Sequence, residues 1–287
     1  MLDYLLEPFS YQYMVRAIWV SALVGGVCAF LSSYLMLKGW SLMGDALAHA
    51  VVPGVALAYL LQLPYAIGAF IAGMIAAAGM AFIRTKTALR EDTVIGLVFT
   101  TFFAVGLLMA SANPMAVDIE GIILGNVLAI TNYDILQVSF ISIVSAGILA
   151  LKWKDMVAVF FDENHARSLG LPVTALKILF FTLLSAAAVA ALQTVGACLV
   201  IAMVITPGAA SYLLTDRFGR LVVISIFLGV ITSATGAYIS YYINASPGGI
   251  IVSLQTLIFL GAFFLAPKHG FIAGKRRENI LSQPERP

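Results

Sequence analysis

The chain has 287 residues, of which 61% are hydrophobic and only 10% are charged. Its mean hydropathy is +1.00, and this composition excludes a soluble globular domain, in which about 25% of residues are charged. We therefore expect an all-α, polytopic integral membrane protein. The small net charge of +2 gives no reason to expect a nucleic-acid partner, and the partner at the apolar surface is membrane lipid.

Apolar segments close to the roughly 20 residues that cross a bilayer as a helix recur along the chain. They predict a bundle of about eight or nine transmembrane helices, some discontinuous, in one domain over residues 1–267, with a basic cytoplasmic tail at 268–287. Residues 112–130, which contain Asn113-Pro114 and Gly125-Asn126, predict a surface loop with a short interfacial helix. The expected segments are 13–37, 41–61, 65–83, 93–111, 134–151, 173–193, 195–214, 221–243 and 250–266.

The basic residues predict the orientation of the chain, because cytoplasmic loops carry an excess of Lys and Arg. Pairs of predicted spans separate successive basic clusters, so all the clusters fit on the cytoplasmic side. This arrangement predicts an N-terminus outside and a cytoplasmic C-terminus. The clusters are Arg84, Lys86 and Arg90; Lys152, Lys154 and Arg167; Arg217 and Arg220; and Lys268, Lys275, Arg276, Arg277 and Arg286.

An aspartate and a histidine stand four residues apart in the apolar run Gly44-Asp45-Ala46-Leu47-Ala48-His49. On a helix such residues share one face, with Cβ atoms about 6 Å apart. Of the 14 acidic residues and three histidines, only these two fall well inside a predicted span, where a charge costs at least ~2.5 kcal/mol. Carboxylate and imidazole suit Mn²⁺, Fe²⁺ or Zn²⁺. Asp45 and His49 are therefore candidate metal ligands, and the alternative is a hydrogen-bonded pair that holds two helices together.

Two side chains make an incomplete site for a transition ion, which ordinarily takes four ligands. A two-fold dimer would bring two copies of Asp45 and two of His49 to a shared axis and would supply four.

Proline-glycine pairs interrupt two of the predicted spans. Pro53-Gly54 follows the Asp45/His49 pair, and Thr206-Pro207-Gly208 lies in a later span. Discontinuous helices in a membrane free backbone carbonyls that can line a pathway. We therefore expect Pro53, Gly54, Thr206, Pro207 and Gly208 to mark helix breaks beside a pathway through the membrane.

The loop at 154–171 contains the pattern of a short capped helix. Asp162 is a capping residue, Glu163 and Arg167 form a pair at i and i+4, and Gly170 ends the pattern before Pro172. Such a helix could dock into a groove on a partner through Ala166 and Leu169. The alternative is an ordinary capped helix in a surface loop.

Several of these motifs together resemble the permease subunits of bacterial ABC importers for manganese, zinc and chelated iron. The resemblance covers almost the entire chain and is carried by Gly44 to Gly54, Gly125-Asn126, the loop Ala166 to Gly170, and Thr206 to Ala210. The runs Leu6-Glu7-Pro8-Phe9 and Leu35 to Leu42 look most like the chelated iron/manganese branch.

The resemblance implies a transport function in the bacterial inner membrane. Asp45 and His49 match the channel metal ligands of the family. Asp162, Glu163, Ala166, Arg167, Leu169 and Gly170 match the coupling helix that contacts a separate ATP-binding subunit. The other implied partners are a periplasmic metal-binding protein and a second permease, identical or paralogous. No permanently bound cofactor is expected, since Mn²⁺, Fe²⁺ or Zn²⁺ would be cargo.

The chain itself is not expected to be an enzyme. It has no GxxxxGK[ST] motif, and the run Gly270 to Lys275 lacks the required spacing and the following Ser or Thr. Three alternatives stay open: a Zn²⁺ permease of the same family, a metal-chelate (siderophore-type) permease, and a gradient-driven secondary transporter. A gradient-driven transporter would place charges along several spans. Asp45 and His49 supply ligands for a bare ion, so they favour the Zn²⁺ permease over the metal-chelate permease.

Overall fold

The computed structural model describes residues 2–40, 42–112, 131–266 and 270. All regular secondary structure in these residues is helical, as the composition predicts. The predicted loop helix within 112–130, with its Gly125-Asn126 motif, and the basic tail lie almost entirely outside the described residues. The helices are α1 (Leu2–Ser10), α2 (Gln12–Lys38), α3 (Met43–Ala50), α4 (Val52–Leu60), α5 (Tyr65–Lys86), α6 (Glu91–Ala112), α8 (Asn132–Phe161), α9 (Glu163–Ser168), α10 (Val173–Val195), α11 (Ala197–Leu214), α12 (Phe218–Ile243) and α13 (Pro247–Leu265).

Eight stretches of the described chain are long and apolar enough to cross a membrane, and Val200–Leu214 in α11 is a shorter apolar helix. This agrees with the prediction of eight or nine transmembrane helices. Helices α3 and α4 together form one of the eight stretches, Met43–Leu60. Helix α8 continues to Phe161, so the first half of the predicted loop 154–171 is an extension of a helix.

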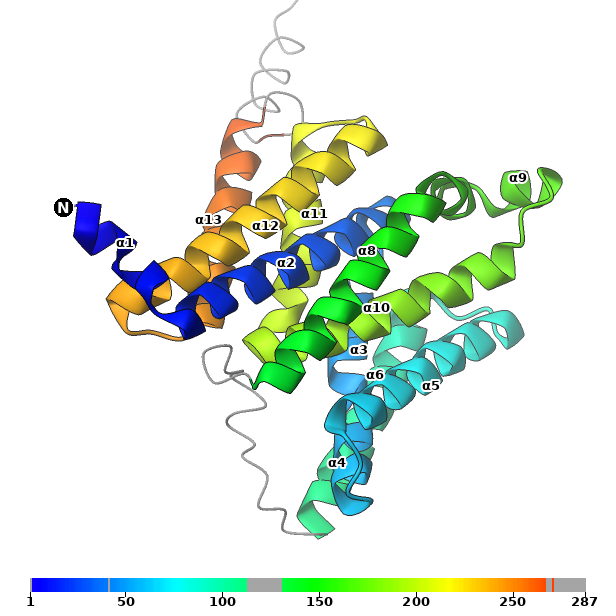
Figure 1. Ribbon diagram of the computed structural model, residues 1–287. Helices are drawn as coiled ribbons and strands as arrows, with labels where there is room; N and C mark the ends of the chain where they lie inside the picture. Colours follow the sequence, from blue (N-terminus) through cyan, green and yellow to red (C-terminus); the bar gives the residue numbers. More distant parts are fainter. Residues whose placement is uncertain (1, 41, 113–130, 267–269, 271–287) are drawn as a thin grey trace, which may run out of the picture.

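Helix α2 is the centre of the larger group of helices in Figure 1. It packs against α8, α10, α11 and α12, and α13 lies against α11 and α12. Helices α4, α5 and α6 pack on one another as a second group. Helix α3 contacts α6 from the second group and α10 and α11 from the first. The short helix with Asp45 and His49 therefore lies where the two groups meet.

Glycines allow the closest helix contacts in each group. In the α2–α12 crossing, a Cβ on Gly25 or Gly229 would collide with the backbone carbonyl of the other residue. In the α4–α5 crossing, Gly54 and Gly68 have the same reciprocal relation. Small residues let membrane helices approach until their backbones touch, which gives more dispersion contact than lipid provides.

Candidate metal centre and the α9 connection

Asp45 and His49 lie on one face of α3, as their spacing predicts. Nε2 of His49 is 3.3 Å from Oδ1 of Asp45, and the two side chains are 20% and 30% exposed, respectively. A helix rises about 1.5 Å per residue, so Asp45 lies about 3 Å and His49 about 9 Å along the axis from Met43. In the span Met43–Leu60, Asp45 is thus near one end and His49 is closer to the middle.

Two phenylalanines of α6 surround the imidazole of His49. The rings of Phe99 and Phe103 lie edge-on to it, with centroids at 5.3 and 5.5 Å, and they stack on each other at 6.0 Å. These contacts fix the plane of the imidazole while its Nε2 faces Asp45. Neither residue was predicted as part of the site, although their i and i+4 spacing in a predicted span indicates that they share a face.

The carboxylate of Asp45 has an unsatisfied oxygen. Its Oδ1 atom is buried and has no hydrogen-bond partner, and its nearest polar contact is Nε2 of His49 at 3.3 Å. A buried acceptor without a donor costs about 1–3 kcal/mol, and more when it is charged. A cation bound between Asp45 and His49 would remove this cost, so the donor chemistry of the pair fits a metal ion.

The chain contributes few ligands to such a site. Among the residues that the structure describes, no three His, Cys, Asp or Glu side chains are grouped closely enough to hold a metal ion. Among these four residue types, Asp45 and His49 therefore form a candidate site with two side-chain ligands, called the half site below.

The helix that contains the pair bends directly after His49. Helix α3 ends at Ala50, and α4 begins at Val52 with Pro53 in its first turn. Val51 keeps right-handed helical dihedral angles, so the junction is a kink rather than a loop. Pro53 has no N–H to donate to the carbonyl of His49, the residue four positions earlier. Gly54 faces α5 in the crossing described above.

The predicted break at Pro207 is wrong. Helix α11 continues through Thr206, Pro207 and Gly208 from Ala197 to Leu214. Where α11 passes this proline, buried Ser32 of α2 donates a hydrogen bond to the carbonyl of Ile205 and accepts one from the N–H of Gly208, both at 3.0 Å, and so ties α11 to α2. This side chain supplies polar partners on both sides of the proline, as neighbouring helices do at prolines in membrane helices. A Cβ at Gly208 would collide with Ser32.

Helix α9 forms where the sequence predicts a short capped helix. The Asp162 side chain accepts hydrogen bonds from the N–H groups of Asn164 and His165 at 2.9 and 3.1 Å. Gly170 ends the segment with φ +75°, a conformation that glycine adopts without steric cost. Leu169 is 60% exposed, but Ala166 is 0% exposed. The expectation that Ala166 is available to a partner is therefore wrong, because α9 packs this face onto its own chain.

The predicted pair between Glu163 and Arg167 is replaced by a longer-range connection. Oε1 of Glu163 lies 2.6 Å from Nζ of Lys177 in α10 and 3.4 Å from Nζ of Lys38 at the end of α2. Partial burial alone would raise the pKa of Glu163, but the hydrogen bond from Lys177 and the two positive charges outweigh it and hold the pKa below its usual value. One carboxylate thus ties α9 to the ends of two long helices.

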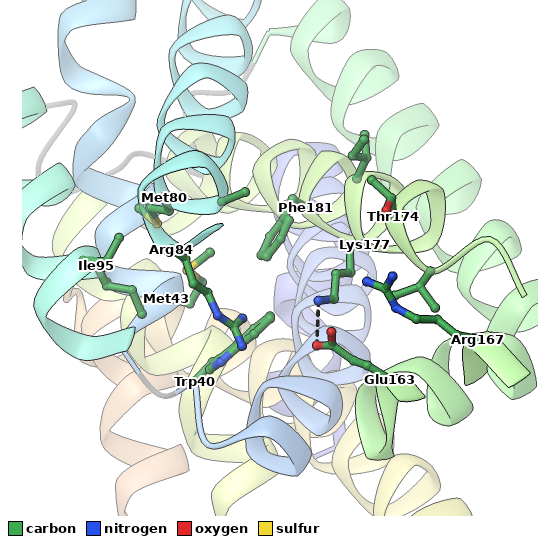
Figure 2. A pocket seen from close by; sticks show the side chains of 14 residues that line it. Trp40, Met43, Met80, Arg84, Ile95, Glu163, Arg167, Thr174, Lys177 and Phe181 are labelled. Atoms are coloured by element: carbon green, nitrogen blue, oxygen red, sulfur yellow. Dashed lines mark ion pairs between the residues drawn. The ribbon is translucent and has the colours of Figure 1, made fainter. Parts of the chain in front are cut away.

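A cavity of about 320 Å³ lies beside this connection. Figure 2 shows Glu163 and Lys177 on one side of it and Arg84 on the other, next to Trp40. The guanidinium of Arg84 lies 5.7 Å from the centre of the Trp40 ring. Met43, two residues before Asp45, also lines the cavity. The cavity therefore lies between α9 and α10 on one side and α5 and α6 on the other, at the end of the helix bundle where α3 begins.

These features define a multi-pass membrane protein with a two-ligand polar site between two helix groups and a short, tightly anchored helix at one end. The chain belongs to the ABC 3 transport family, which matches residues 10–266.

Known relatives cover nearly the whole chain. It is 65% identical over 280 residues to the chelated iron transport system membrane protein YfeC of Yersinia pestis, and the match covers 98% of this chain and 95% of YfeC. It is 47% identical over 285 residues to the manganese transport system membrane protein MntB of Synechocystis, with 98% and 92% coverage. Among solved structures, PsaBC from Streptococcus pneumoniae in complex with Fab matches with a TM-score of 0.85 and 32% identity, over 96% of this chain and 100% of that chain.

Proposed function

We propose that this chain is the membrane-spanning permease subunit of an ATP-driven importer that moves Mn²⁺ or Fe²⁺ into the bacterial cytoplasm. The single observation that supports this most strongly is the Asp45–His49 half site, whose buried Oδ1 atom has no hydrogen-bond partner. The names of the relatives, which refer to iron and manganese transport, support these two ions over Zn²⁺. The cargo ion is a substrate and is held only during passage.

The proposed orientation places α9 in the cytoplasm and α1 outside the inner membrane. Lys38 and Lys177 are at the same end of the bundle as α9, since Glu163 contacts both. The basic residues Arg84 and Lys86 end α5, and Arg84 lines the same cavity as Glu163. This gathering of positive charge at one end supports a cytoplasmic location through the positive-inside rule.

A second permease would complete the metal site. Because one chain offers two ligands, a partner with an equivalent pair would give the four that suit a transition ion. We propose such a dimer, with either an identical copy or a paralogue as the partner. Size measurement of the purified complex with two differently tagged copies of this chain distinguishes the two compositions.

The energy for transport would come from a separate ATP-binding subunit, so this chain would not itself be an enzyme. The exposed side chains of Arg167 and Leu169 are available for contact with it, while Asp162 and Gly170 fix the ends of α9 and Glu163 anchors it. A periplasmic metal-binding protein would deliver the ion at the opposite end. Movement of α9 on ATP hydrolysis would then rock the helix groups between outward and inward states.

The test is ATP-dependent uptake of radiolabelled Mn²⁺, Fe²⁺ and Zn²⁺ in cells that lack their own importers. We expect Asp45→Ala and His49→Ala each to abolish uptake of the cargo ion while the complex still assembles. Asp155→Asn is the matched control, because that acid is on α8 and pairs only with Lys152 at 3.2 Å on the surface. Retained uptake in both variants would exclude the half site, and uptake of Zn²⁺ alone would assign the chain to zinc import.

A further inference from the structure

Helix α1 takes no part in the proposed metal site or in the α9 connection, yet its residues are strongly segregated. Leu2, Leu5, Leu6 and Phe9 follow the i, i+3, i+4, i+7 pattern of one helix face, and Asp3, Glu7 and Ser10 follow the pattern of another. Helices with an apolar and a charged face bind where two media meet.

The contacts of α1 give these two faces a direction. Oε1 of Glu7 accepts a hydrogen bond from the Tyr241 hydroxyl at 3.1 Å, and the ring of Phe9 lies 5.7 Å from that of Tyr238. Tyr238 precedes Tyr241 by about one turn, or about 5 Å along the axis, and α12 ends at Ile243. Phe9 is therefore directed toward the middle of the bundle and Glu7 toward its end.

The surroundings of α1 match a membrane interface. Ring contacts link Tyr11, Tyr13, Tyr241 and Tyr242 at this end of the bundle, and tyrosines gather where the bilayer meets water. Figure 1 shows α1 turned across the direction of α2. Leu6 and Phe9 are 55% and 51% exposed, and Trp19 in α2 is 61% exposed.

We propose that α1 lies in the membrane interface at the end opposite α9, with its apolar face against lipid acyl chains and its acidic face toward water. The occupant of the apolar face is lipid rather than a protein, since α1 joins the membrane-spanning α2 through the single residue Tyr11 and its Phe9 contacts Tyr238 of the membrane-spanning α12. Through Glu7 and Phe9, α1 then anchors the end of α12 at a fixed depth.

Nitroxide labels on α1 test this placement in the complete transporter, reconstituted in lipid nanodiscs. In a background with Cys28→Ala and Cys198→Ala, single cysteines replace Leu6 and Phe9 on the apolar face or Asp3 and Ser10 on the acidic face. Electron paramagnetic resonance then compares collisions with oxygen, which concentrates in lipid, and with a water-soluble nickel chelate. Leu6→Cys provides the lipid-side reading if Phe9→Cys disturbs the contact with Tyr238.

We expect several-fold higher oxygen than nickel accessibility at Leu6 and Phe9, and the reverse at Asp3 and Ser10. Equal nickel accessibility at all four positions would place α1 in water and overturn the proposal. Loss of label mobility at Leu6 and Phe9 only after the periplasmic metal-binding protein is added would overturn it too, because the face would then be a protein-docking surface.

Discussion

Replacement of Ser32 by alanine tests how α2 supports the proline-containing helix α11. The Ser32 hydroxyl makes two hydrogen bonds to α11, at 3.0 Å each, to Ile205 and Gly208. Each such bond contributes about 0.5–1.5 kcal/mol net, so we expect Ser32→Ala to lower the free energy of unfolding by about 1–3 kcal/mol. Alanine otherwise fits the site, because it removes one atom and adds none.

The neighbouring residue Ser33 provides a matched control. Ser33 is as fully buried as Ser32, but its hydroxyl bonds at 3.2 Å to the carbonyl of Ala29 in its own helix. The Ser225 hydroxyl also bonds to that carbonyl, at 2.7 Å, so Ser33→Ala leaves it satisfied. We expect this variant to change stability by less than about 0.5 kcal/mol.

Equilibrium unfolding in mixed micelles with increasing dodecyl sulfate, followed by circular dichroism, measures both variants against the unsubstituted protein. Equal stability losses for Ser32→Ala and Ser33→Ala would refute the reasoning. In that case α11 would tolerate Pro207 without help from α2, and the bonds from Ser32 would have no net value.

Three further predictions concern other contacts. Glu163→Gln is expected to uncouple ATP hydrolysis from uptake, measured as a lower ratio of ions moved to ATP hydrolysed, and an unchanged ratio would contradict the anchoring role of Glu163. Because the folded-state pKa of Glu163 is lowered, its stabilising effect should be fully present above the usual carboxylate pKa and should disappear as the pH falls through the lowered value. A stability difference between Glu163→Gln and the unsubstituted protein that does not shrink as the pH falls through the acid range would oppose this. Gly68→Val should separate α4 from α5 and lower the free energy of unfolding by more than about 2 kcal/mol. Gly79→Val is the control, because a Cβ there meets nothing within 4 Å, and it should lower the free energy of unfolding by about 1 kcal/mol or less. Equal losses for the two variants in the unfolding assay would exclude a tight crossing of α4 and α5.

Local patterns predicted the features that depend on local chemistry. Hydropathy located the spans because each helix must satisfy its own backbone in lipid. The cap of α9 followed from Asp162, and the shared face of Asp45 and His49 followed from their spacing. These features need only the periodicity of a helix and the preferences of single residues.

Features that depend on another helix were not predictable in this way. Pro53 and Pro207 are each followed by a glycine, but Pro53 is next to a kink and Pro207 lies in a continuous helix. The partner of the second helix at this point, Ser32, is more than 170 positions away in sequence, so local patterns could not reveal it. Glu163 contacts Lys38 and Lys177 rather than Arg167 because folding brings the ends of α2 and α10 to α9. The contacts of Phe99 and Phe103 with His49 depend on the packing of α6 against α3.

The length and attachments of α2 give it the properties of a lever. Its 27 residues extend about 40 Å without a break. Near one end it is linked to α9 through Lys38, between that end and its middle Ser32 bonds to α11, and at Gly25 its backbone lies close to the backbone of α12 at Gly229. A tilt of about 3° around that crossing would move an end 20 Å away by about 1 Å, given the rise of a helix per residue. The helix α2 would then pivot at the glycine crossing, and α2 would transmit small displacements of α9 to α11.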